Sequence, residues 1–181
     1  MVQRRNVDIG IADATLELLR TGGPRSVTVE AVAARSGIAK TTIYRRHRDR
    51  REMLSGALSR LTAPEPLAAQ ATGDDRLRWL IEHAVETVED GIGYGGFAAL
   101  LTDADPEFAA VFRQILVDQR AELESTIDAG KADGSIRADV DPATLIDAVV
   151  GAHIAERART GEVADGWEQR LFDLFRPTVL A

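Results

Sequence analysis

The sequence predicts an all-α protein in two parts, a three-helix helix-turn-helix domain at the N-terminus and a larger helical domain after it. Apolar residues recur at spacings of three and four along most of the 181 residues, which is the period of an amphipathic helix. Few segments show the alternation of a β-strand. Gly37 joins two short helical patterns, and a proline-containing stretch without a clear period follows Thr62.

The composition excludes several classes of protein. Hydrophobic residues make up 45% of the chain, enough for a core, and the chain has no cysteine. A disulfide framework, a thiolate metal site and a cysteine nucleophile are therefore excluded, and a reducing compartment is favoured. No apolar run is long enough to cross a bilayer, and the N-terminus lacks the apolar segment of a signal peptide. We expect a cytoplasmic protein that does not contact a membrane.

Charge is divided unevenly along the chain. Residues 1–62 hold 12 Lys and Arg against 6 Asp and Glu, a balance of +6; the rest of a chain with 22 and 29 holds 10 against 23, or −13. The positive end can displace counterions from phosphate, whereas the acidic remainder would repel DNA. This division favours a nucleic-acid contact confined to the N-terminal part.

The first half of the predicted motif is a short helix after Thr28. Val29, Val32 and Ala33 fall on one face and predict its buried side. Thr28 precedes this face and can cap the helix by accepting a hydrogen bond from a free backbone N–H. Gly37 ends the helix, because a glycine readily takes the left-handed backbone of a sharp turn.

The second helix, Ala39 to about His47, exposes hydrogen-bond donors. Ile43 is its clearest apolar anchor; the donors are Lys40, Thr41, Thr42, Tyr44, Arg45 and Arg46, followed by Arg48, Arg50 and Arg51. Two short helices joined by a glycine turn, the second rich in donors, are typical of a helix-turn-helix that enters the major groove of double-stranded DNA. A solvated basic face in an ordinary helical protein is the alternative interpretation.

Two further helices complete the N-terminal domain. Val7, Ile11, Ala14 and Leu18 form the apolar stripe of a scaffold helix that ends before Pro24, with a mobile arm at residues 1–5. Asp49 caps a linking helix, residues 49–62, whose buried side is Met53, Leu54, Ala57, Leu58 and Leu61. We place the border within residues 63–74, which gives domains 1–62 and 63–181.

The second domain is predicted to contain four or five helices. They cover residues 75–90, 97–101, 106–129, 142–160 and 165–175, with residues 91–96 as a glycine-rich loop between helices. Asp141 and Pro142 form a helix start. Asp103, Asp105 and Glu107 alternate as calcium ligands can, but no complete calcium-binding loop follows, so we interpret them as helix-capping carboxylates and predict no metal site.

Several residues of the predicted helix-turn-helix and the helix after it together resemble a known family motif. They are Thr28-Val29, Val32-Ala33, Gly37-Ile38, Thr42-Ile43-Tyr44-Arg45, Arg50 and Glu52-Met53-Leu54. Together they resemble the N-terminal DNA-binding domain of the tetracycline-repressor (TetR) family of transcriptional regulators, over residues 6–59. Beyond these residues the resemblance is one of size, helical content and order of elements.

The resemblance implies a role for individual residues. Lys40, Thr41 and Arg45 stand where the family reads bases, and cations suit guanine while a threonine methyl suits thymine. Phosphate contacts are implied for Thr28, Thr42, Tyr44, Arg46 and Arg50. Three positions depart from the family pattern. Ala39 replaces a capping serine, and Arg50 replaces a typical lysine and keeps its charge. His47 replaces a common aromatic residue, and we expect the loss of apolar packing to loosen the junction.

The resemblance also implies a homodimer and a small-molecule effector, and it implies no cofactor. The last two helices would pair with their symmetry mates, through Ala148, Val149, Ala152, Ala155, Trp167, Leu171 and Phe175. Candidate pocket residues are Trp79, His83, Phe97, Phe108, Phe112 and Gln119, which could equally be core. The implied mechanism is a repressor that a small molecule releases from a palindromic operator.

Two other classes of function compete with this interpretation. An enzyme is disfavoured, because the chain has three histidines, no cysteine and no recognisable catalytic or metal-binding spacing. A helical ligand-binding or protein-binding module, whose helix-turn-helix no longer reads DNA, is favoured slightly by Ala39 and His47.

Overall fold

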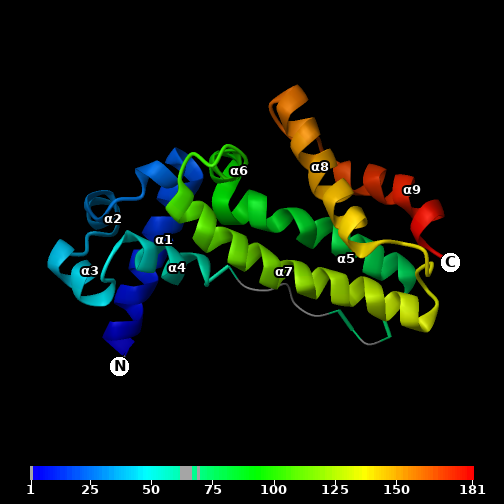
Figure 1. The fold of residues 1–181 in the computed structure, drawn as a ribbon, viewed down its shortest axis with the longest axis horizontal. Coiled ribbons are helices and arrows are strands. Elements are labelled where there is room, and N and C mark those ends of the chain that lie inside the picture. Colours follow the sequence, from blue (N-terminus) through cyan, green and yellow to red (C-terminus); the bar gives the residue numbers. More distant parts are fainter. Residues whose placement is uncertain (1, 62–66, 69) are drawn as a thin grey trace. The chain divides into compact units, whose positions relative to one another are not determined.

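The computed structural model describes residues 2–61, 67–68 and 70–181, and within these ranges the protein is helical (Figure 1). The only β-type pairing described is one antiparallel bridge between Ile136 and Leu180. The all-α prediction is confirmed. The elements are α1 (Val2–Gly22), η1 (Pro24–Ser26), α2 (Val29–Ser36), α3 (Lys40–Arg46), α4 (Arg50–Leu58), α5 (Gly73–Glu86), η2 (Thr87–Ile92), α6 (Gly93–Leu101), α7 (Pro106–Asp133), α8 (Pro142–Thr160) and α9 (Trp167–Val179).

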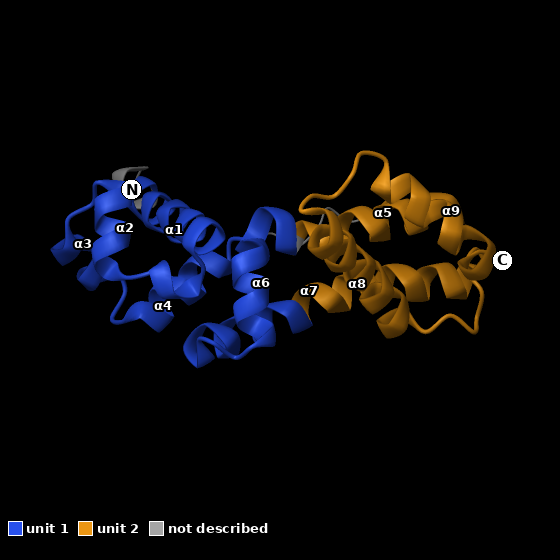
Figure 2. Cartoon of the chain, turned by 90° about the horizontal axis from the view of Figure 1, so that it is seen from above, with its two compact units in different colours: residues 1–62, 87–117 blue, residues 63–86, 118–181 orange. Residues whose placement is uncertain are grey.

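The chain forms two compact units that do not follow the order of the sequence (Figure 2). Unit 1 contains residues 1–62 and 87–117, and unit 2 contains residues 63–86 and 118–181. The helix-turn-helix therefore shares its unit with η2, α6 and the first part of α7. Residues 63–66 and 69 of the predicted border lie outside the described residues, and the division into 1–62 and 63–181 stays a prediction.

Unit 1 has one core, built from both of its chain segments. Residues before position 62 supply Ile11, Leu19, Val32, Ile43, Met53, Leu54 and Leu58, and the later segment supplies Ile92, Phe108, Val111 and Phe112. Full burial of one such side chain is worth about 1.5–3 kcal/mol. The later segment is thus a substantial part of what stabilises the helix-turn-helix.

Unit 2 has its own core, formed by α5, the end of α7, α8 and α9. It includes Leu77, Leu80, Ile81, Leu123, Ile127, Leu145, Ile146, Val149, Trp167, Leu171 and Phe172. The guanidinium of Arg78 lies 3.7 Å from the centre of the Phe172 ring and adds a cation–π contact between α5 and α9. The end of the chain is held by a hydrogen bond from Arg137 N to Val179 O, 2.9 Å.

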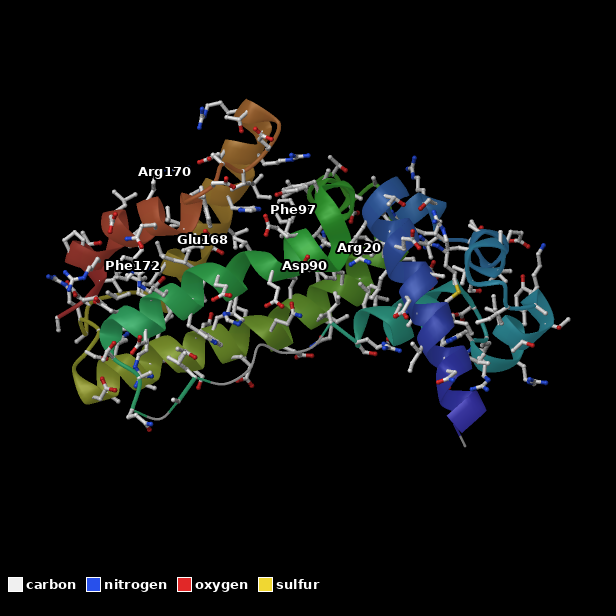
Figure 3. All side chains as sticks on the ribbon, turned by 180° about the vertical axis from the view of Figure 1, so that it is seen from behind. Arg20, Asp90, Phe97, Glu168, Arg170 and Phe172 are labelled. Carbon is white, nitrogen blue, oxygen red and sulfur yellow. The ribbon has the colours of Figure 1, made fainter. Side chains whose placement is uncertain are left out.

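The glycine-rich stretch 91–96 is not the loop that the sequence predicted. It continues the π-helix η2 into α6. Gly93 has a φ of 68°, and a Cβ there would lie 3.0 Å from the Cα of Arg20 in α1. Arg20 also donates a 2.6 Å hydrogen bond to Asp90 O, and Figure 3 shows the two residues side by side. The glycines therefore permit close approach to α1 instead of forming a connection.

Several helix limits also differ from the prediction. α1 begins at Val2, where the sequence predicted a mobile arm, because residues 2–6 contain no glycine or proline to stop the helix; Met1 and the side chains of residues 2–5 lie outside the described residues. α7 continues past residue 129 to Asp133, and α9 past residue 175 to Val179. The caps predicted at Asp49 and Asp141 are confirmed.

Candidate nucleic-acid interface

The turn between α2 and α3 has the predicted geometry. Thr28 Oγ1 accepts a 3.1 Å hydrogen bond from Ala31 N, so the N-terminal cap of α2 is confirmed. Gly37 takes the left-handed conformation, with a φ of 70°, and its N–H donates to Ala33 O over 3.0 Å. The Ser36 hydroxyl accepts from Ile38 N and braces the turn. The helix-turn-helix of the sequence prediction is confirmed.

α3 presents its donors to solvent and its apolar anchor to the core. Ile43 has 0% of its surface exposed, whereas Tyr44 is 54% exposed. Thr41 and Arg45 are exposed, and the Lys40 side chain is 53% exposed. Thr42 is half-buried. This arrangement leaves a polar, hydrogen-bonding helix face open to a partner.

Both ends of α3 carry the departures noted in the sequence. Ala39 is the residue before α3 and gives no side-chain cap, as predicted. His47 follows α3 and is half-buried. A Cβ on Gly56 of α4 would lie 3.2 Å from His47 Cε1, so the imidazole fills the space that this glycine leaves. The prediction that His47 loosens the junction is not tested by this contact.

Two cations of α3 form ion pairs with residues of α1 and α2. Lys40 Nζ lies 3.1 Å from Glu30 Oε1, and this hydrogen bond is the main cause of a lowered pKa for the Glu30 carboxyl. Arg46 Nη1 donates to both carboxylate oxygens of Asp8, over 2.6 and 2.8 Å. Arg45, by contrast, makes no hydrogen bond or ion pair with the part of the chain that the structure describes. Its guanidinium is open to a partner.

Arg50, at the start of α4, points into unit 1. Its Nε donates to Val27 O at 2.8 Å, and its Nη2 to Pro24 O and Asp105 Oδ2, both at 2.6 Å. Its Nη1 donates to Glu107 Oε2 at 2.7 Å and to Asp105 Oδ1 at 3.3 Å. We call these five residues the Arg50 network. The prediction that Arg50 contacts phosphate is untested, but its side chain is only 24% exposed.

The Arg50 network shifts the pKa values of Arg50 and Asp105. Burial lowers the pKa of Arg50, but hydrogen bonds and charge interactions with Asp105 and Glu107 outweigh this and raise it. Burial would raise the pKa of Asp105, yet hydrogen bonds from Arg50 and from Phe108 N hold it below its ordinary value. Asp105 thus caps α7, as predicted, and binds Arg50 at the same time.

Sequence reasoning missed the acidic partners of this surface. These partners are Asp8, Glu30, Asp105 and Glu107. They lie between 10 and 57 positions from their lysine or arginine along the chain. It also missed Arg25, whose Nε and Nη2 both donate to Ala104 O, over 3.2 and 2.8 Å. No periodicity links residues so distant, so the sequence held no signal for these pairs.

The predicted pocket residues belong to different units. Phe97, Phe108 and Phe112 are in unit 1, where Phe108 and Phe112 are fully buried and stack with their ring centres 5.6 Å apart. Trp79, His83 and Gln119 are in unit 2, where Trp79 and His83 stack at 4.6 Å. Phe108 and Phe112 are core residues of unit 1. A pocket formed by the six stays a prediction.

The predicted dimer residues divide into two groups within unit 2. Val149, Trp167 and Leu171 are buried in the unit's own core. Ala148, Ala152 and Phe175 are half-buried, and Ala155 is exposed. Leu174 of α9, which is not among the predicted dimer residues, is 64% exposed. The dimer surface stays a prediction.

A donor-rich helix presented by a glycine turn defines the chain as a helix-turn-helix protein of the DNA-binding class. Residues 11–57 match the family described as bacterial regulatory proteins of the tetR family, and residues 70–175 match the tetracyclin repressor-like C-terminal domain. The chain belongs to the TetR family of transcriptional regulators. The resemblance predicted from the motif is thereby confirmed.

Solved structures share this fold along almost the whole chain. A TetR transcription regulator from Haloarcula marismortui ATCC 43049 is 17% identical, with a TM-score of 0.71, over 98% of this chain and 100% of that one. A putative transcriptional regulator from Saccharomonospora viridis in complex with choline is 18% identical, with a TM-score of 0.67, over 98% and 99%. FadR from Bacillus subtilis, in complex with stearoyl-CoA, is 18% identical, with a TM-score of 0.64, over 92% and 96%.

The comparison with curated proteins found no match. Among the helices of the described ranges, none combines the length and the apolar character that crossing a bilayer requires.

Proposed function

We propose that the chain is a homodimeric repressor that binds a palindromic operator in double-stranded DNA and is released from it by a small molecule. The observation that carries the DNA-binding part is the face of α3. Ile43 is fully buried while Lys40 and Tyr44 are about half exposed, so the helix is anchored from behind and its donors point outward. A recognition helix needs this arrangement to enter the major groove.

The exposed donors divide into base-reading and backbone roles. Lys40, Thr41 and Arg45 would read bases, with Arg45 as the strongest candidate because it has no competing partner among the described residues. Thr28, Thr42, Tyr44 and Arg46 would contact phosphates. The Thr28 hydroxyl accepts from Ala31 N, which leaves its own O–H free to donate to a phosphate oxygen.

The ion pair between Lys40 and Glu30 does not prevent a DNA contact. Both side chains are more than half exposed, so water screens the pair and a charge-assisted hydrogen bond to a phosphate or a guanine can replace it at little cost. Arg46 differs, because its side chain is only 16% exposed while its partner Asp8 is about half exposed. A phosphate contact by Arg46 therefore competes with its hydrogen bonds to Asp8.

A salt titration tests the DNA-binding proposal. The unaltered chain is titrated into duplexes of random sequence, and then into the duplex enriched from them, at several salt concentrations. We expect log K to fall linearly with log salt, by about 0.9 for each phosphate contacted. The enriched sequence should be a palindrome with half-sites about 34–36 Å apart, as a twofold dimer requires. An enriched sequence without symmetry would contradict the dimeric part.

The effector proposal rests on the match to the C-terminal domain and on the family. Residues 70–175 match the C-terminal domain, and the solved neighbours with choline and stearoyl-CoA show such folds with chemically unlike ligands bound. A ligand can release DNA only by binding more tightly to a state whose recognition helices do not match the half-sites. We propose that the protein needs no cofactor and catalyses no reaction. We also propose that it acts in the cytoplasm.

One observation favours a second candidate, a ligand-binding or protein-binding module that no longer reads DNA. Lys40, Arg46 and Arg50 each form an ion pair with a carboxylate of the same chain. If these pairs persist, the positive charge available to DNA is smaller than the sequence suggests. Undetectable or salt-independent binding to duplexes by the ligand-free chain would support the module and reject the repressor.

A further inference from the structure

We propose that Arg50 is a positioning residue that fixes the start of α4 against two turns of unit 1, and that it does not contact DNA phosphate. The inference rests on the proposed DNA-binding function. It concerns the position where the TetR-like motif of this chain carries an arginine instead of a lysine.

The hydrogen bonds of Arg50 leave it no donor for a phosphate. A guanidinium has five N–H groups, one on Nε and two on each Nη. The structure gives Nε one acceptor and each Nη two, all within 2.6–3.3 Å. A phosphate oxygen could bind only if one of these bonds were broken.

The charges of the network also argue against a phosphate contact. Arg50 carries one positive charge, and Asp105 and Glu107 carry two negative charges within 3.3 Å of it. The side chain of Asp105 is only 11% exposed. An ion pair this buried is screened little by water or salt, so removal of Arg50 would leave Asp105 without its partner.

The acceptors of Arg50 lie on two separate turns. Pro24 and Val27 belong to the turn between α1 and α2, and Asp105 and Glu107 to the start of α7. In the turn that precedes α7, Asp103 has a φ of 49°, rare for a residue with a side chain, and Ala104 O accepts hydrogen bonds from Arg25 Nε and Nη2. Arg50 therefore joins the start of α4 to both turns, with two hydrogen bonds to the first and three to the second.

A lysine at position 50 could not make these five hydrogen bonds. An ammonium group has three N–H donors at one point, whereas the acceptors of Arg50 surround a planar group and lie on two turns. Lysine would nevertheless keep the positive charge that a phosphate contact needs. The substitution Arg50→Lys thus separates the two roles.

The experiment compares Arg50→Lys and Arg50→Gln with Arg48→Lys and Arg48→Gln. Arg48 lies two residues away and its side chain is 85% exposed, so its variants make the same charge changes without disturbing the network. Affinity is measured over a range of salt concentrations, for the duplex enriched by the unaltered chain. Hydrogen exchange of backbone amides and the midpoint of thermal unfolding, Tm, are measured without DNA.

We expect both Arg50 variants to weaken DNA binding by roughly tenfold, with the slope of log K against log salt unchanged. Amide exchange should become faster at residues 24–28 and 103–108, and Tm should fall. Arg48→Lys should change none of these, and Arg48→Gln should leave Tm and exchange unchanged. Arg50→Lys should therefore be as impaired as Arg50→Gln, although it keeps the positive charge.

Two results would overturn the proposal. One is an Arg50→Lys variant that binds like the unaltered chain while Arg50→Gln lowers the salt slope by about 0.9, the loss of one phosphate contact. The other is unchanged amide exchange in both Arg50 variants. If the unaltered chain binds no duplex, the proposed function fails instead, and the exchange measurement still decides the role of Arg50.

Discussion

At the scale of single residues, Ala39 and Thr28 show how much one hydroxyl matters at a helix start. Thr28 accepts a backbone hydrogen bond at the start of α2, whereas Ala39 offers none at the start of α3. A capping side chain is worth about 0.5–2 kcal/mol relative to alanine. The recognition helix is therefore the less stable of the two at its first turn.

We expect Ala39→Ser to raise the free energy of unfolding by about 0.5–1 kcal/mol, because the new hydroxyl can accept from an N–H in the first turn of α3. Urea denaturation followed by circular dichroism measures the change. Ala34→Ser, on the exposed face of α2, is the control and should be neutral or slightly destabilising. An Ala39→Ser variant no more stable than the control would contradict the cap.

Arg45 and Tyr44 are neighbours that should differ in their effect on DNA binding. Arg45→Ala removes the donor that we propose reads a base, so we expect relaxed preference at one base pair of each half-site and a loss of about 1–3 kcal/mol on the enriched duplex. Tyr44→Phe removes the hydroxyl that we propose contacts a phosphate, so it should weaken all duplexes about equally. Selection from random duplexes with each variant measures both effects. Equal loss on every sequence for Arg45→Ala would assign Arg45 to the backbone instead.

At the scale of elements, the start of α7 depends on the Asp105 carboxylate, which caps the helix and also pairs with Arg50. This makes the start of α7 sensitive to acid. The pKa of Asp105 is held below its ordinary value of 3.8, so the folded state favours the carboxylate. Its contribution to stability is complete above pH 3.8 and is lost as the pH falls through the lower folded pKa. In that window the unfolded chain binds more protons, so stability rises with pH.

Asp105→Asn should reduce this dependence on acid. Asparagine keeps an oxygen that can cap α7 but has no carboxyl group to titrate. We expect the unaltered chain to lose more stability than the variant between pH 4 and the lower folded pKa, and the variant to be less stable at neutral pH. Tm measured at intervals below pH 5 tests this. Parallel curves for the two proteins would rule out Asp105 as a source of the dependence.

The elements also show which features could be predicted from the sequence. α2, α3 and their glycine turn follow from local rules, because a cap, an apolar face and a left-handed glycine lie within ten residues of each other. The glycines of residues 91–96 misled the prediction, since Gly93 is required by the approach of Arg20 in a distant helix. A sequence pattern reports what a residue permits, but the partner that makes use of it lies elsewhere in the chain.

At the scale of the whole molecule, the proposed dimer depends on surfaces of α8 and α9. Leu174 is 64% exposed and lies on α9, one of the two helices through which the proposed dimer would form. We expect Leu174→Glu to shift the chain toward monomer in sedimentation equilibrium, because dimerisation would bury a carboxylate. Leu101→Glu is the matched control: Leu101 is 70% exposed but lies on α6 of unit 1. Equal behaviour of the two variants would argue against this dimer surface.

The uneven distribution of charge along the chain could be read from the sequence. The ion pairs that the N-terminal cations form could not. The positive balance of residues 1–62 correctly pointed to the helix-turn-helix. It did not reveal that Arg46 and Arg50 are held by Asp8, Asp105 and Glu107, because a count of charges carries no distances. The candidate site was therefore found from sequence, whereas the ranking of its cations required the structure.

The shared core of unit 1 limits how regulators of this kind can be recombined. Ile92, Phe108 and Phe112 lie in the same core as Ile11, Val32 and Ile43. A hybrid regulator made by grafting residues 1–62 onto a foreign sensing region would lose these three partners and leave an apolar gap behind its recognition helix. Transplanting residues 87–117 together with the N-terminal segment would keep that interior whole, so the practical seams for such hybrids lie near residues 86 and 117.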